Sequence, residues 1–331
     1  MADKRLGSKI PPCTRVPLVL WHLFWISFIL ILVQSKTVWL LLVSVGLLLI
    51  VAFLVLIERN ILRLVQERKR PNVVGIYGVV QTVMDGGKLL LKQIVLADGA
   101  HMIFFILSPV ICFILSLFSW AFVPVPFILF SSKYSILITL FISSVLVYPI
   151  LWARWSSRSM YSLLGGVRAV AQMISYEVVI GVFIALLVLL FGYPSWEGFL
   201  YYELTRATFS LFWVIFIAWI AVMLAELNRS PFDLVERESE LVSGFNVEYS
   251  RYRFTLLFLA EYINIWLMGF ITALIFFGGI QVVLGSAIVF TGLYVRSMVP
   301  RLKFTDLIIL TWKTFLPIVL LSLILCVLLN F

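Results

Sequence analysis

Charged side chains are scarce in this sequence. Asp, Glu, Lys and Arg make up 12% of its 331 residues, whereas 63% are hydrophobic and the mean hydropathy is +1.12. A soluble globular domain usually has about twice that share of charge. Long apolar runs separate the charged residues, which predicts an all-α, polytopic transmembrane helix bundle. We expect residues 1–331 to form a single membrane domain, because the spans leave too little chain for a separate soluble one.

Residues that could hold a redox centre are also few. The cysteines, Cys13, Cys112 and Cys326, are scattered without a CxxC pair. The two histidines, His22 and His101, are isolated. An iron–sulfur cluster or a zinc site needs clustered thiolates or imidazoles, and a bis-histidine haem needs a pair of histidines. With no GxGxxG, GxxxxGK[ST] or Ser/His/Asp arrangement either, we expect no metal site, redox centre or nucleotide chemistry on this chain.

Nine apolar segments are long enough to be candidate spans. They lie at residues 17–34, 38–57, 102–123, 135–153, 171–191, 208–227, 254–279, 281–297 and 307–328. The first is short and contains a histidine, so an interfacial helix or a signal-like segment is the alternative there.

The basic residues favour nine crossings. With nine spans, 21 of the 25 Lys and Arg residues fall on one side of the membrane, Lys36, Lys133 and Arg206 fall on the other, and Lys313 lies inside the last span. The positive-inside rule makes the basic side the matrix or cytoplasmic side, and it places the N-terminus there. The net charge of +9 therefore reflects membrane topology, and no nucleic-acid partner is expected.

Carboxylates gather in residues 225–249, between two apolar runs on the basic side. Ser230 and Gly244 suit the start and the end of a short acidic helix at residues 231–243. The six acids are Glu226, Asp233, Glu236, Glu238, Glu240 and Glu248. The second, third and fifth share a helical face, so at least one of them is expected to hold its proton near neutral pH. A solvated charged face is the alternative.

Three acids occur in or at the edge of apolar runs: Glu177, Glu226 and Glu261. Ionisable groups inside a bilayer are costly and usually functional. We therefore predict that function involves these acids.

The segment at residues 58–93 continues the second span and then breaks at Pro71. Residues 76–92 are amphipathic, with Asp85 and Lys88 three positions apart, as in an interfacial helix with basic residues that reach the membrane surface. The pattern ER…RKRPN-VVG-YG-VQ…D-GKL…K resembles the first matrix loop of NADH–ubiquinone oxidoreductase chain 1, the quinone-chamber family of respiratory complex I.

Further motifs extend the resemblance from about residue 38 to the end of the chain. They are GVRAVAQMISYEV (166–178), AELNRSPFDL-E-ESELVSGFN-EY (225–249), LAEYIN (259–264), R-VPR (296–301) and WK-FLP (312–317). The sequence departs from the family pattern at Asn60, at Arg237 and at Phe304 and Thr305. Arg237 is expected to pair with a neighbouring acid, Glu240 or Asp233. Residues 1–37 have no counterpart in typical members.

The resemblance implies eight family spans, preceded here by an extra N-terminal one, and a ubiquinone access tunnel shared with hydrophilic quinone-site subunits. It also implies that NADH, FMN and iron–sulfur clusters bind to partner subunits, while neighbouring membrane-arm subunits and lipids contact this chain. The proton relay is expected to contain Glu177, Glu226, Asp233, Glu236, Glu238, Glu240 and Glu261. The quinone tunnel is expected to contain Arg59, Asp85, Lys88, Arg168, Arg229, Phe254 and Phe258.

Other classes of function stay open at the level of sequence. They are the equivalent subunit of a membrane-bound hydrogenase, a secondary ion or proton transporter, and a structural anchor for a soluble enzyme. A transporter is expected to show internal repeats, and none is found. The expected location is the mitochondrial inner membrane, with a bacterial plasma membrane as the alternative.

Overall fold

The computed structural model describes residues 16–69, 74–75, 78–93, 99–124, 130–206, 213–229, 231–232, 249–278, 281–300 and 302–328. The side chains of residues 16–37, 202–206, 213–214 and 281 lie outside this description. Among the described residues there are helices and no strands, which confirms the all-α prediction. Two compact units are formed, residues 1–45 and residues 46–331, and the account of packing below concerns the second.

The first helix, α1 (Val16–Gln66), is continuous over 51 residues. Two separate helices were predicted here, at residues 17–34 and 38–57, and that prediction is wrong. The intervening QSKT has neither glycine nor proline, and polar residues alone do not end a helix. Two crossings require a turn, so the nine-crossing arrangement fails in that form. The side chains of residues 17–34 lie outside the description.

Eight apolar helices follow the family-like part of the sequence. Six are long enough to cross a membrane: 38–66, 102–122, 135–156, 160–191, 252–277 and 304–328. Two shorter ones occupy 215–226 and 282–298. Each coincides with one of the segments predicted from residue 38 onward, so the polytopic helical architecture is confirmed.

The elements after α1 are mostly single helices. They are α2 (Gln81–Leu91), α3 (Met102–Ser119) with the 3₁₀ turn η3 (Trp120–Phe122), α4 (Ser135–Ser156), α5 (Met160–Phe191), α6 (Trp196–Arg206), α7 (Trp213–Glu226), α9 (Tyr252–Phe277), α10 (Gln281–Met298), α11 (Phe304–Leu310), the π-helical turn η7 (Thr311–Phe315) and α12 (Leu316–Leu328). The last three form one span.

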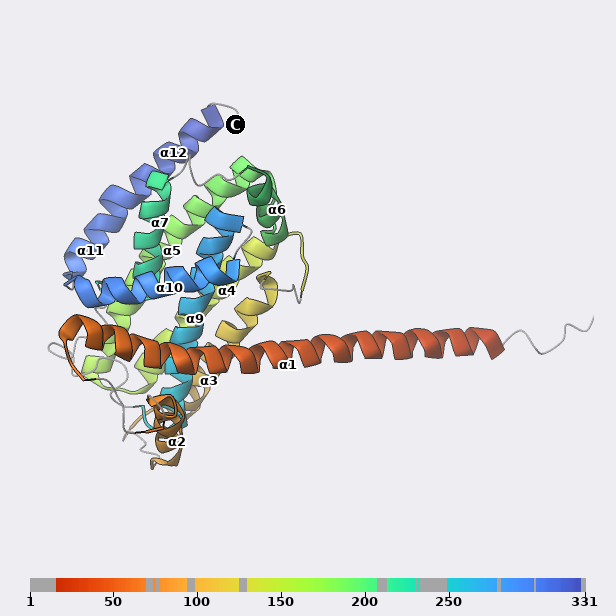
Figure 1. Cartoon of the computed structure of the whole chain (residues 1–331), viewed down its shortest axis with the longest axis horizontal. Helices are drawn as coiled ribbons and strands as arrows, with labels where there is room; N and C mark the ends of the chain where they lie inside the picture. Colours follow the sequence, from red (N-terminus) through yellow and green to blue (C-terminus); the bar gives the residue numbers. More distant parts are fainter. Residues whose placement is uncertain are drawn as a thin grey trace, which may run out of the picture. The chain divides into compact units, whose positions relative to one another are not determined.

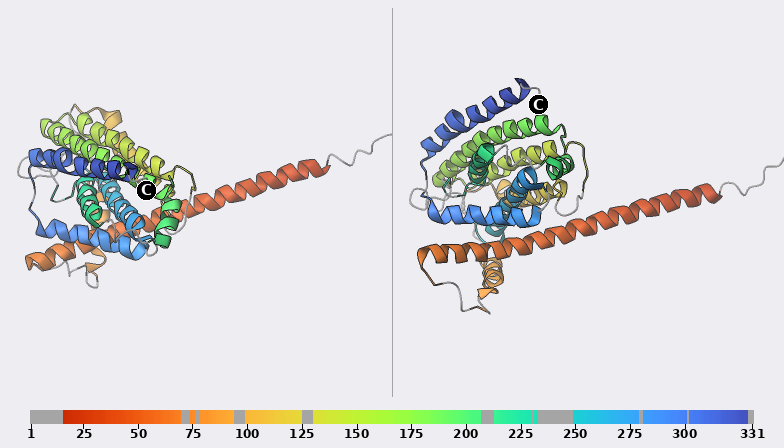
Figure 2. Two further views of the ribbon diagram at one scale, coloured as in Figure 1. Left: turned by 90° about the horizontal axis from the view of Figure 1, so that it is seen from above. Right: turned by 45° about the horizontal axis from the view of Figure 1, so that its top comes forward.

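The bundle is built around α9, which contacts α10, α3 and α7 (Figure 1). In turn, α3 packs on α4, and α4 on α5. The α11–α12 span runs along one edge of the bundle, beside α5 (Figure 2). Inside the bundle, the Trp219 indole N–H of α7 donates to Thr272 Oγ1 of α9 at 3.0 Å, which satisfies a buried donor. Helices remote in sequence thus meet around one interior.

Candidate functional site

A cavity of about 130 Å³ lies between α3, α4, α5, α7 and α9. A buried water needs at least about 10–15 Å³, so the cavity has room for several. Its lining includes three carboxylates, Glu177, Glu226 and Glu261, each on a different helix. Water in such a space can connect acids that do not touch one another.

The lining also contains cationic and amide groups. They belong to Arg154, Arg229, Arg296, Asn228 and Asn264. Three acids and three arginines therefore surround one space, among apolar residues such as Leu146, Ile180 and Met268. Because apolar walls screen charges poorly, the charge state of one acid strongly affects the others.

The position of Glu226 follows from the way α7 ends. Asn228 has a left-handed backbone conformation, with φ of 51°, which turns the chain out of the helix. The Gln172 side chain of α5 then donates to the backbone oxygens of Ala225 at 2.8 Å and of Phe232 at 3.0 Å. This buried amide satisfies carbonyls that the end of the helix leaves without partners. Glu226 is thereby held at the cavity.

Buried Arg154 is fixed by close contact with α5. Its Nη1 donates to the backbone oxygen of Gly166 at 3.0 Å. A Cβ atom at Gly166 would lie 2.7 Å from the Arg154 Cδ atom, so only glycine allows this approach.

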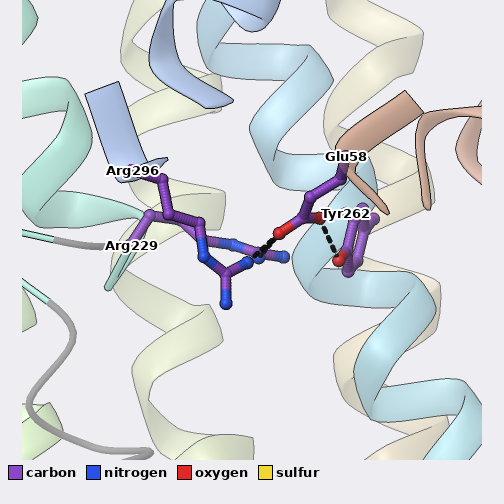
Figure 3. A network of polar contacts seen from close by, with 4 residues as sticks. All are labelled: Glu58, Arg229, Tyr262 and Arg296. Carbon is purple, nitrogen blue, oxygen red and sulfur yellow. Dashed lines mark hydrogen bonds and ion pairs between the residues drawn. The ribbon is translucent and has the colours of Figure 1, made fainter. Parts of the chain in front are cut away.

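A second polar cluster adjoins the cavity (Figure 3). Glu58 of α1 is 5% exposed, and its Oε1 atom pairs with Nη1 of Arg229 at 3.3 Å and with Nη1 of Arg296. Its Oε2 atom accepts a hydrogen bond from the Tyr262 hydroxyl at 2.5 Å. The Arg229 guanidinium also lies 4.3 Å from the centre of the Tyr262 ring, in a cation–π contact.

This cluster joins four parts of the chain. Glu58 comes from α1, Arg229 follows α7, Tyr262 belongs to α9, and Arg296 belongs to α10. Both arginines line the cavity and share one carboxylate between them. Glu58 therefore holds two cationic groups at the edge of the space that contains the three acids.

The two ends of the acidic segment are fixed by side chains of other helices. Gln172 binds Phe232 at one end, as described above. At the other end the Tyr249 ring stacks on Phe105 at 4.4 Å, and its hydroxyl donates to the Ala153 oxygen at 2.8 Å. Burial raises the pKa of Tyr249, so the hydroxyl stays a neutral donor.

Of the predicted relay acids, the structure thus brings Glu177, Glu226 and Glu261 together. The others, Asp233, Glu236, Glu238 and Glu240, lie outside the described residues, as do Ser230, Arg237, Gly244 and Glu248. The predicted helix at 231–243 and the pairing of Arg237 stay predictions.

Most of the predicted tunnel residues lie away from this cavity. Arg59 and Asp85 form an ion pair of 2.6 Å, with 44% and 34% of their side chains exposed. Phe254 and Phe258 stack at 6.0 Å. Lys88 is exposed and Arg168 is half-buried. Only Arg229 of the seven lines the cavity.

Sequence reasoning missed Glu58, Tyr262 and Arg296 as members of the site. One local signal was available, because Glu58 ends a long apolar run and lies next to Arg59. Tyr262 directly follows the relay candidate Glu261, and Arg296 opens the R-VPR motif. Nothing in their spacing indicated that they meet.

Fold and site together define a polytopic helical membrane protein with acids from three helices around one cavity. The family model described as NADH dehydrogenase matches residues 38–327, and the chain belongs to this family. Its relatives include NADH-ubiquinone oxidoreductase chain 1 of Branchiostoma lanceolatum, 44% identical over 279 residues that cover 83% of this chain and 89% of that protein. The same-named protein of Xenopus laevis is 43% identical over 298 residues, covering 85% and 90%. That of Metridium senile is 41% identical over 299 residues, covering 84% and 88%. The resemblance seen in the sequence is thus confirmed.

Proposed function

We propose that this chain, as the membrane subunit of an NADH:ubiquinone oxidoreductase, couples quinone reduction to proton translocation through Glu177, Glu226 and Glu261. The observation that carries the proposal is the meeting of these three carboxylates at one cavity, from helices that are far apart in the sequence. Soluble redox subunits have no need of acids placed in this way. A membrane path for protons does need them.

The coupling is electrostatic. Reduction of quinone to quinol takes up protons, which changes the charge near the basic side of the membrane. In surroundings of low dielectric constant, such a change alters the proton occupancy of nearby acids, and coupled acids respond as a group. The cavity water then carries protons between Glu226, Glu177 and Glu261.

The quinone-facing part of the proposal extends beyond the cavity. Asp233, Glu236, Glu238 and Glu240 form the cluster that first receives the change in charge. Arg59, Asp85, Lys88 and Arg168 contribute to the polar end of a ubiquinone tunnel, Arg229 joins that end to the cavity, and Phe254 and Phe258 line its apolar part. Hydrophilic quinone-site subunits complete the tunnel and carry FMN and iron–sulfur clusters, and NADH reacts there.

The proposed location is the mitochondrial inner membrane, where the membrane-arm subunits of the same complex surround this chain. Residues 38–331 form the family core of a single membrane domain, and residues 1–37 are an N-terminal extension.

Glu-to-Gln substitution tests the relay, because it removes the titratable group and keeps the shape. Glu177→Gln or Glu261→Gln is expected to leave the complex assembled on native gels while quinone-dependent NADH oxidation and proton pumping fall together. The same result is expected for Glu236→Gln and Glu240→Gln. Glu197→Gln is the matched control, since Glu197 is exposed on α6 and is absent from the cavity lining. Normal coupled turnover in both cavity variants would refute the proposal.

A further inference from the structure

The last span contacts the rest of the chain through one narrow stripe. Its buried residues are Leu307, Thr311, Val319 and Cys326, which recur at helical spacing and face α5. In its most apolar stretch 17% of the residues are buried, against 56% for α9. Most of the surface of this span therefore lies open within the described chain, at the edge of the bundle (Figures 1 and 2).

Lys313 lies on the open side of the span. It is two residues beyond buried Thr311, which is roughly half a helical turn around the axis, and its side chain is exposed. Among the described residues, no carboxylate lies within ion-pairing distance of its amino group. The neighbouring Trp312 is 53% exposed and Ile309 is 48% exposed.

The depth of Lys313 sets it apart from the other lysines of the described chain. It lies nine residues after Phe304, the first residue of the helix, which corresponds to about 14 Å along the axis at about 1.5 Å per residue. The hydrocarbon core is about 30 Å thick, so Lys313 lies well inside the span. Lysines near helix ends can extend to the membrane surface, but a cation at this depth is costly without a counter-charge.

The backbone is also unusual at this position. Thr311–Phe315 forms a π-helical turn inside an otherwise α-helical span. Such turns are rare and frequently occur at functional sites. Here the turn contains Lys313 and Trp312 together, on a helix whose packing against α5 does not require either side chain.

We propose that the open face around Lys313 docks a transmembrane helix of a neighbouring subunit of the same complex, and that this helix presents a carboxylate to the lysine amino group. Trp312 and Ile309 supply the apolar contact on either side of the ion pair. A carboxylate fits better than a lipid phosphate, because phosphates lie at the surface of the hydrocarbon layer and Lys313 lies within it. The proposal rests on membership of a multisubunit complex and is independent of the proton relay.

A hydrophobic carbodiimide tests the pair directly in the assembled complex. Dicyclohexylcarbodiimide activates an intramembrane carboxylate, and an adjacent lysine amine then displaces the dialkylurea to form an amide. Mass spectrometry is expected to find Lys313 joined to an Asp or Glu in a membrane helix of another subunit. A link to an acid of this chain itself, or a bound phospholipid at Lys313 with no link, would overturn the proposal.

Substitutions complete the test. Lys313→Arg keeps the charge and is expected to preserve assembly while the amide link disappears. Lys313→Met is expected to lose the partner subunit from the complex on native gels. Lys303→Met is the control, because Lys303 is exposed just before the span begins. Retention of the partner subunit in Lys313→Met would overturn the docking site, whereas an unchanged proton relay in that variant would not affect it.

Discussion

Removal of the charge of Glu58 is expected to destabilise the complex more than any exposed substitution on the same helix. Glu58→Gln keeps an oxygen for the Tyr262 hydroxyl but leaves Arg229 and Arg296 without their shared carboxylate. Loss of one partner from a buried ion pair costs about 3–5 kcal/mol. The Arg229 and Arg296 side chains are 14% and 23% exposed, and both line a cavity that can hold water. We therefore expect the lower end, about 3 kcal/mol.

The assay is the rate of irreversible heat inactivation of quinone-dependent NADH oxidation in the assembled complex. A loss of about 3 kcal/mol corresponds to an increase of up to roughly a hundredfold in that rate. Tyr262→Phe removes one hydrogen bond to a charged group and is expected to cost about 1.5–3 kcal/mol. Glu67→Gln makes the same chemical change at an exposed position of α1 and serves as the control. If Glu58→Gln and Glu67→Gln inactivate at the same rate, the cluster does not stabilise the protein.

Two further predictions concern the supports of the cavity. Gly166→Ala would place a Cβ atom 2.7 Å from Arg154 Cδ, so a loss of about 1–3 kcal/mol is expected in the same heat-inactivation assay. Gly181→Ala, also on α5 but with no atom within 4 Å of the added Cβ, is expected to have no such effect. Gln172→Leu removes the donor to Ala225 and Phe232 and is expected to cost about 1–3 kcal/mol. Its ratio of pumped protons to oxidised NADH is expected to fall, since the end of α7 that carries Glu226 loses its support; an unchanged ratio would contradict this role.

The features that sequence reasoning found are those in which a single residue conflicts with its neighbours. A carboxylate in an apolar run, as at Glu177 or Glu261, conflicts with the cost of charge in a bilayer, and both acids were singled out for that reason. The helices from residue 38 onward were predicted because apolar length alone defines a span.

The features that it missed depend on contacts between distant segments. Glu58 is 171 residues from Arg229 and 204 residues from Tyr262, and helical periodicity carries no information about such pairs. The turn predicted at residues 35–37 failed for the opposite reason, because local polarity was taken as a break where no residue interrupts the backbone hydrogen bonds.

The Glu58 cluster also has a consequence for the order of biogenesis. Arg296 is synthesised 238 residues after Glu58, which at about 5–20 residues per second takes roughly 10–50 s. During that interval α1 is already made, yet the arginines that neutralise its carboxylate have not left the ribosome. Glu58 must then remain in contact with water or with the insertion machinery. The tertiary contacts of the first helix are therefore completed only when nearly the whole chain has been translated.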